Sequence, residues 1–141
     1  MTAEEYLRQA YRLDKLIHSV ALEAAELRDA VANISSPKLD EHYDPNRPTD
    51  APFVRVFESV WELEEKVKTN MDKLVRLREQ ITRSIDSLDN ADEQMVLRYR
   101  YLHHYTWEQI SHELSGDLRT IRRWHKSALS HIAIPENPIL I

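Results

Sequence analysis

The chain of 141 residues contains no cysteine and a single glycine, Gly116. Without cysteine it cannot form disulfides or thiolate zinc sites, which fits a reducing cytoplasmic location. Sheet proteins usually need several glycines for tight turns, and the common nucleotide-binding folds need glycines where the backbone approaches phosphates. The shortage of glycine therefore predicts an all-α protein and argues against those enzyme folds.

The sequence also lacks a long apolar run. No segment approaches the roughly 20 apolar residues that a membrane-spanning helix requires. The first residues, MTAEEYLRQ, are acidic and amphipathic, which is not typical of a signal peptide. With a formal net charge of −5, the chain is expected to be cytoplasmic and to have no membrane partner.

No constellation typical of catalysis or metal binding stands out. Paired carboxylates such as Glu64 and Glu65 lie in helical, exposed patterns, and no serine, histidine and aspartate set has a catalytic context. The best histidine cluster is His103 and His104 with His112, but adjacent helical histidines point to different faces, and no HExxH motif or cysteine partner exists. We therefore expect no enzymatic activity, no metal and no cofactor.

Apolar residues recur at alternating steps of four and three from about residue 3 to 34, as in a coiled-coil seam. They are Tyr6, Ala10, Leu13, Ile17, Val20, Ala24, Leu27, Val31 and Ile34. The same rhythm continues in a second seam formed by Phe53, Phe57, Val60, Val67, Met71, Leu74, Ile81, Ile85 and Leu88. Between them, residues 35–52 are polar and hold four of the six prolines, which predicts an irregular loop. Residues 1–88 are thus expected to form a long antiparallel, coiled-coil-like helical hairpin that serves oligomerisation.

Two charged residues interrupt the second seam. Glu64 and Arg78 occupy seam positions, where they could set the register or pair with another helix or chain. Trp61, Leu63 and Leu77 flank the seam and leave apolar surface for a second protomer. We therefore expect a homodimer.

Local capping signals divide the following region, residues 89–134, into three short helices. Asn90 with Glu93 forms a capping-box pattern that opens a helix to about residue 103, which should bury Met95, Val96, Tyr99 and Leu102. Thr106 with Gln109 repeats the pattern and opens a helix that ends at residue 114. Residues 135–141 form a tail that contains prolines.

The last two of these helices have the features of a helix-turn-helix, in which a short turn joins two packed helices. Residues 115–116 make the turn, and Asp117 caps a helix that runs to about residue 132. Ile110 and Leu114 should meet Ile121 and Trp124, which fixes the crossing angle of the two helices.

The outer face of the last helix carries a cationic strip. Its members, at helical spacing, are Leu118, Arg119, Arg122, Arg123 and Lys126. Arginine can grip guanine in the major groove or a phosphate, so Arg119, Arg122 and Arg123 are candidates for base contact and Lys126 for phosphate contact. His125 and His131 lie on the same helix and could add pH-dependent charge.

Residues 88–132 resemble region 4 of housekeeping-class sigma factors, which reads a promoter element. The resemblance rests on Leu-Arg-Tyr at 97–99, Thr-Trp-Glu-Gln-Ile at 106–110 and Lys-Ser-Ala-Leu at 126–129. It implies that Leu118, Arg119, Arg122 and Arg123 contact DNA. The chain departs from the pattern in three ways: Ser115 stands where the turn glycine is usual, Leu118 replaces a polar residue, and Trp124 replaces an aliphatic one.

The layout of a coiled-coil half followed by a region-4-like half is similar to that of small phage-encoded late-transcription regulators of Gram-positive hosts, of the ArpU-like type. The resemblance implies a sequence-specific regulator that binds double-stranded DNA at late or packaging gene promoters. Two alternatives stay open. The chain could be a small terminase-like packaging component, or an adaptor that binds RNA polymerase and has no DNA specificity of its own.

Overall fold

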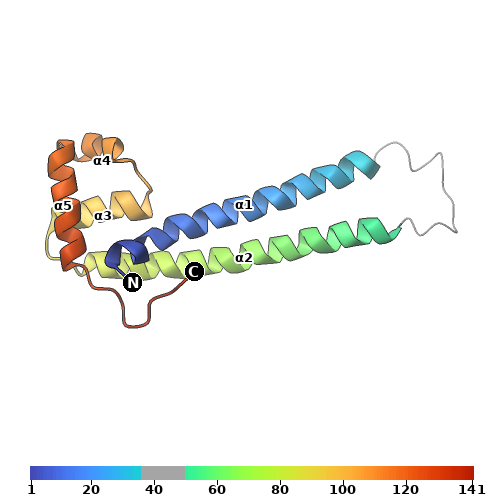
Figure 1. Cartoon of the computed structure of the whole chain (residues 1–141), viewed down its shortest axis with the longest axis horizontal. Helices are drawn as coiled ribbons and strands as arrows, with labels where there is room; N and C mark the ends of the chain where they lie inside the picture. The colour runs from blue at the N-terminus through green and yellow to red at the C-terminus, as the bar shows by residue number, and fades with distance from the viewer. Residues whose placement is uncertain (36–49) are drawn as a thin grey trace. The chain divides into compact units, whose positions relative to one another are not determined.

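The computed structural model of the chain describes residues 1–35 and 50–141, with side chains at 1–33 and 54–141. All regular secondary structure in these residues is helical (Figure 1). The elements are α1 (Ala3–Ser35), α2 (Asp50–Asp86), α3 (Ala91–Leu97), the π-helix η1 (Arg98–Leu102), α4 (Trp107–Leu114) and α5 (Leu118–His131). The prediction of an all-α chain is confirmed for the described residues.

The ends of the predicted loop at 35–52 are helical. Ser35 belongs to α1, and α2 begins at Asp50. Pro52 is tolerated there because the first turn of a helix leaves its N–H groups without intrahelical partners. The rest of the predicted loop lies outside the described residues. No helix in the described ranges carries an apolar stretch of the length that a bilayer requires.

The chain divides into two compact units. The terminal unit comprises residues 1–14 and 72–141, and the middle unit comprises residues 15–71. Each unit therefore contains one part of α1 and one part of α2. The sequence predicted a boundary between residues 88 and 89, which lies inside the terminal unit. The oligomerisation role of residues 1–88 and the DNA-binding role of residues 89–134 stay predictions.

The heptad phase of α1 agrees with the sequence. The residues expected on its seam are buried from the first turn to the sixth, namely Tyr6, Ala10, Leu13, Ile17, Val20 and Ala24. Leu27 and Val31 are half-buried, and the side chain of Ile34 lies outside the described residues. The opposite face of α1 has no second series of apolar residues at heptad spacing. The pattern therefore indicates one buried stripe.

The buried face of α2 contains one half of the predicted seam and differs in the other half. Val60, Ile81 and Ile85 are buried as predicted. Phe57 and Met71 were expected in the seam but are 61% and 52% exposed, whereas Leu77 was expected beside the seam and is fully buried. Leu63 and Asn70 precede the predicted seam positions 64 and 71 by one residue and are half-buried. Apolar residues occupy two adjacent stripes of α2, so periodicity alone could not select the stripe that packs. The side chain of Phe53 lies outside the described residues.

The two charged residues of the predicted seam each have a partner within their own unit. In the middle unit, Glu64 of α2 pairs with Arg28 of α1, and both side chains are partly exposed. In the terminal unit, Arg78 donates a hydrogen bond to the carbonyl of Leu102 at 2.7 Å. Arg78 thus ties α2 to the end of η1.

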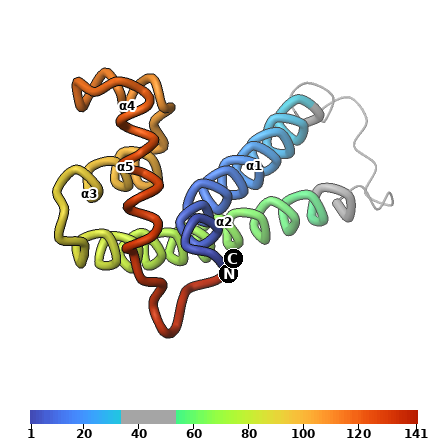
Figure 2. The backbone as a smooth tube through the Cα atoms, turned by 60° about the vertical axis from the view of Figure 1, so that its left-hand side comes forward, coloured from blue at the N-terminus to red at the C-terminus, as the bar shows by residue number. Residues whose placement is uncertain are grey.

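Two glutamines of the terminal unit bond the C-terminal tail to α1 and α2. The amide of Gln9 donates to the carbonyl of Ile139 at 2.9 Å and accepts from the backbone N–H of Ile141 at 3.2 Å. Gln80 accepts from the N–H of Ile139 and donates to the carbonyl of Asn137. The tail therefore lies against α1 and α2 within the terminal unit, and Figure 2 shows it turning back from the end of α5.

The third predicted helix ends in a π-helical turn. The N–H of His103 bonds to the carbonyl of Arg98, five residues earlier, at 3.1 Å. Val96 and Leu102 are buried as expected, while Tyr99 is half-buried and Met95 is 37% exposed, contrary to expectation. The wider turn brings Tyr101 and Leu102 together on the buried side, because it changes the angular phase of the residues that follow.

Ser115 provides a test of local strain. It ends α4 in the left-handed region, with φ 53° and ψ 35°, a conformation that glycine adopts with less steric cost. We expect Ser115→Gly to raise the free energy of unfolding by about 0.5–1 kcal/mol. Urea unfolding followed by circular dichroism checks this, with Ser130→Gly, inside α5, as a control that should destabilise. A Ser115→Gly variant no more stable than the parent would contradict the strain.

Candidate nucleic-acid interface

Thr106 begins α4 with the capping box that the sequence predicts. The Thr106 hydroxyl accepts from the N–H of Gln109 at 3.2 Å, and the Gln109 side chain accepts from the N–H of Thr106 at 2.8 Å. Two backbone donors that a helix start leaves unpaired are thereby satisfied. The first turn of α4 is fixed by local interactions alone.

The turn between α4 and α5 combines a left-handed residue with a close approach. The N–H of Gly116 bonds to the carbonyl of Ser111 at 3.2 Å, and the Ser111 hydroxyl donates back to the Gly116 carbonyl. A Cβ at position 116 would lie 3.3 Å from Cδ1 of Ile121. Ser115 thus makes the turn in the left-handed conformation, and Gly116 leaves room for the side chain of Ile121.

Asp117 begins α5 as the N-cap. Its carboxylate accepts from the N–H of Thr120 at 2.7 Å. Hydrogen bonds from Thr120 and the charge of Arg123 lower the pKa of Asp117 below its usual value. The residue is therefore anionic at the positive end of the α5 dipole, and any contact with phosphate or bases falls to the residues that follow it.

A small core holds α4 and α5 together. Val96, Ile110 and Ile121 are each fully buried in one cluster, and Leu114 and Trp124 pack against it. The predicted meeting of Ile110 and Leu114 with Ile121 and Trp124 is confirmed. Because these residues define the inner face of α5, the residues between them face outward.

The basic row, defined as Arg119, Arg122, Arg123 and Lys126, lies on this outer face. All four side chains are exposed, and so is Leu118, at 37%. Within the described ranges, no carboxylate forms an ion pair with any member of the row. The structure therefore brings all five predicted site residues onto one exposed face.

Glu93 has a role that the sequence did not indicate. Asn90 caps α3 as expected, accepting from the N–H groups of Asp92 and Glu93. Glu93, however, does not complete a capping box: it is buried and accepts from the Ser127 hydroxyl at 2.6 Å and from Nδ1 of His131 at 2.9 Å. The predicted box is wrong because tertiary partners on α5 take the carboxylate.

A second polar contact connects α5 to η1. The hydroxyl of Tyr101 lies 2.6 Å from Nε2 of His125. Burial raises the pKa of Tyr101 to about 12 and lowers the pKa of His125 below its usual value, so a neutral hydroxyl faces a neutral imidazole. His125 consequently adds no charge to the basic row at neutral pH, unlike the expectation from its place on the helix.

The histidines form no cluster of metal-binding type in the part of the chain that the structure describes. His103 is exposed and His104 contacts the ring of Tyr11 edge-on at 5.2 Å between centroids. No group of three or more histidine, aspartate or glutamate side chains converges among the described residues.

Comparison with known proteins gives one match. A family described as "Protein of unknown function (DUF1492)" matches residues 33–133, which include α2, α3, α4 and α5. No curated protein and no solved structure matches the chain.

The Glu93 contacts predict acid sensitivity. The Ser127 hydrogen bond and, to a smaller extent, His131 lower the pKa of Glu93 below its ordinary value of 4.5. A carboxyl whose pKa is lower in the folded state contributes stability above its unfolded pKa and loses it as the pH falls through the folded pKa. We expect stability to fall below about pH 4.5, and Glu93→Gln to be less stable at pH 7 and to lose less on acidification.

Thermal unfolding between pH 3 and pH 7 measures both effects. Glu113→Gln, at an exposed position of α4, is the matched control and should follow the parent curve. Parallel curves for the parent and Glu93→Gln would show that the Glu93 carboxylate does not cause the acid sensitivity.

Proposed function

The chain belongs to the DUF1492 family, and we propose that it is a sequence-specific regulator of transcription that binds double-stranded DNA through α5. The observation that carries the proposal is the exposed basic row on a helix whose opposite face is locked by Ile121 and Trp124. The proposal is a binding function without catalysis.

The packing of α4 on α5 supports a helix-turn-helix reading. In that motif the first helix braces the second, and the first residues of the second helix enter the major groove. Here Ile110 braces Ile121, and Arg119, Arg122 and Arg123 stand in the first two turns of α5. The fork of an arginine can bond two acceptors of one guanine, which discriminates between bases by about 1–3 kcal/mol per contact.

The charge distribution supports selective binding to a chosen DNA sequence. The chain as a whole has a formal net charge of −5, while the basic row gathers four cations on one helix face. Non-specific affinity depends on the number of phosphates neutralised, so a small basic patch on an acidic protein favours contacts with a defined site. With the likeness to sigma region 4 and phage late-transcription regulators, we place the target at promoters of late or packaging genes.

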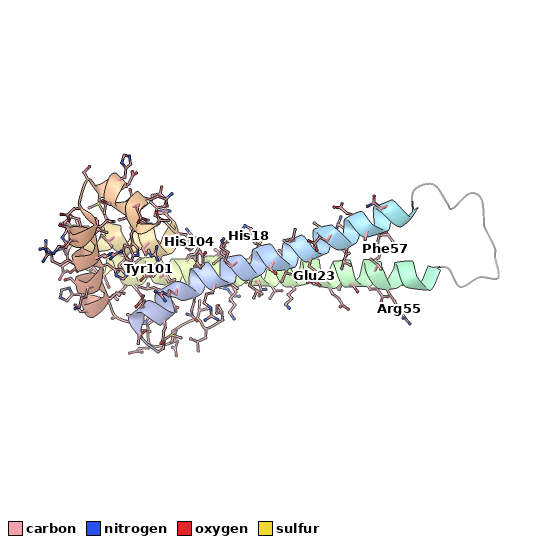
Figure 3. The ribbon with its side chains drawn as sticks, turned by 45° about the horizontal axis from the view of Figure 1, so that its top comes forward. His18, Glu23, Arg55, Phe57, Tyr101 and His104 are labelled. Carbon is pink, nitrogen blue, oxygen red and sulfur yellow. The ribbon has the colours of Figure 1, made fainter. Side chains whose placement is uncertain are left out.

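We further propose that the regulator acts as a homodimer through the middle unit. An exposed apolar stripe runs along α2 at steps of three and four, with Val54, Phe57 and Trp61 exposed by 49%, 61% and 64%. The side chain of Phe57 projects from the ribbon in Figure 3. Apolar residues at this spacing and exposure are typical of a helix that packs on a partner helix. Two copies would double the number of base contacts.

Removing either guanidinium group at positions 122 and 123 of α5 should weaken specific binding. We expect Arg122→Ala and Arg123→Ala each to weaken binding about 10-fold or more, since each base contact contributes about 1–3 kcal/mol. A target sequence is first selected from random duplexes by the parent protein, and fluorescence anisotropy then gives the Kd of each variant.

Two further variants test the phosphate contact and provide a control for the DNA experiment. Lys126→Ala should lower the slope of log K against log salt by about 0.9 if it meets a phosphate, and Arg55→Ala, an exposed arginine of α2, should leave binding unchanged. Parent-like affinity in both Arg122→Ala and Arg123→Ala would overturn the proposed function.

A charge placed in the apolar stripe should dissociate the dimer. We expect Trp61→Glu to shift the mass measured by light scattering from dimer to monomer, because a carboxylate in an apolar contact loses its hydration. Ser59→Glu, exposed on the same helix outside the stripe, is the charge-matched control and should stay dimeric. A parent protein that is monomeric would contradict the dimer, and a large ring would favour the packaging alternative.

A further inference from the structure

The terminal unit contains a cavity that the DNA-binding proposal does not use. Its volume is about 490 Å³, within the range of roughly 300–1,000 Å³ that is common for small-ligand sites. We name it the arginine pocket. It is lined by Arg8, Tyr11 and Arg12 of α1, by Arg100 and Tyr101 of η1, and by His104 and Thr106 of the following loop. Figure 3 labels Tyr101 and His104 on this unit.

The charge of the lining is one-sided. Three arginines line the pocket, and none of its lining residues is an aspartate or a glutamate. Glu4 pairs with Arg8 at 2.5 Å, with side chains exposed by 40% and 61%, and an ion pair in contact with water contributes little stability. Arginine stays charged at all physiological pH values, so the pocket keeps a positive charge that an anion would neutralise.

Arg100 is held in place before any ligand arrives. Its Nη1 donates to the carbonyl of Tyr105 at 2.9 Å, and its guanidinium lies over the ring of Trp107, 4.5 Å from the centroid. A guanidinium has five N–H donors, so donors remain for a ligand after this contact. A fixed arginine loses less conformational entropy on binding than a mobile one.

The walls of the pocket are aromatic. Tyr11 and His104 meet edge to face, and Tyr11 is 48% exposed, so part of its ring stays accessible. Tyr101 adds a third ring, and its hydroxyl lies within hydrogen-bond distance of His125 of α5. Planar rings beside arginines are suited to a ligand that carries both an aromatic base and a phosphate.

We propose that the arginine pocket binds the phosphate of a nucleotide, with Arg8, Arg12 and Arg100 as the phosphate ligands and Tyr11 beside the base. The Thr106 hydroxyl adds a donor at the same rim. The nucleotide comes either free from solution or as part of a DNA strand, and the chemistry of recognition is the same for both. Tyr101 lines the pocket and also contacts His125 of α5. A nucleotide in the pocket would therefore touch a residue that contacts the helix of the basic row.

The first experiment measures binding without DNA. Adenosine 5′-monophosphate is titrated into the full-length protein by calorimetry, with inorganic phosphate and adenosine as partial ligands. We expect the order adenosine monophosphate, inorganic phosphate, adenosine, and a loss of about tenfold for Arg8→Ala and again for Arg12→Ala, since each removes charge-assisted hydrogen bonds. Both arginines are exposed, so the variants should fold, which thermal unfolding verifies. Arg55→Ala is the matched control.

The second experiment identifies the source of the phosphate. If the nucleotide belongs to DNA, the doubly substituted Arg8→Ala, Arg12→Ala protein binds its selected duplex more weakly and with a smaller salt slope, while adenosine monophosphate does not bind. If the nucleotide is free, adenosine monophosphate binds the parent and is lost in the double variant, and duplex affinity without nucleotide is unchanged. The proposal is overturned if the double variant binds both the duplex and adenosine monophosphate like the parent, or if the parent and the double variant bind adenosine monophosphate with the same measurable affinity.

The outcome is separable from that of the proposed function. Arg122→Ala and Arg123→Ala report on α5 and lie outside the arginine pocket. The free-nucleotide arm needs no DNA at all, so the pocket can be confirmed even when α5 fails to bind a duplex, and the reverse also holds.

Discussion

The buried contact between Ile110 and Ile121, with Val96 beside them, is the constraint on which the arrangement of the last three helices depends. One branched side chain on α4 and one on α5 meet at a fully buried point, so the rotation of each helix about its own axis is set. Close packing of this kind tolerates little change in volume. The exposure of the four cations follows from it, since the residues that pack and the residues that face solvent are separated by fixed angles along one helix.

Polar contacts hold the second half of α5, beyond the apolar cluster around Ile121. Glu93 reaches two residues of the second half of the helix, Ser127 and His131, while Tyr101 reaches His125. A buried carboxylate is costly unless its acceptors are satisfied, and here α5 supplies the donors. The position of α5 is therefore specified by α3 and η1 as well as by α4, and Gly116 permits the close approach that the turn requires.

Local signals made the helix limits predictable, whereas contacts distant in sequence were not. Thr106 and Asp117 cap their helices through residues three positions away, so sequence alone identifies them. The face of α2 that packs depends on its partner, and a choice between adjacent stripes placed Met71 inside and Leu77 outside when the reverse holds. Glu93 satisfied a local capping pattern but bonds to a residue 34 positions later. The arginine pocket combines residues from α1 and η1, and no local pattern connects them.

The fastening of the tail by Gln9 and Gln80 has a consequence for the kinetics of folding. Ile139 bonds to Gln9 of α1 and Gln80 of α2, and Ile141 bonds to Gln9, a residue 132 positions away in the sequence. Closing a long loop costs conformational entropy before the contact rewards it. The hydrogen bonds of the tail are therefore expected to form after the local helices and their caps, as a late step in the folding of the terminal unit.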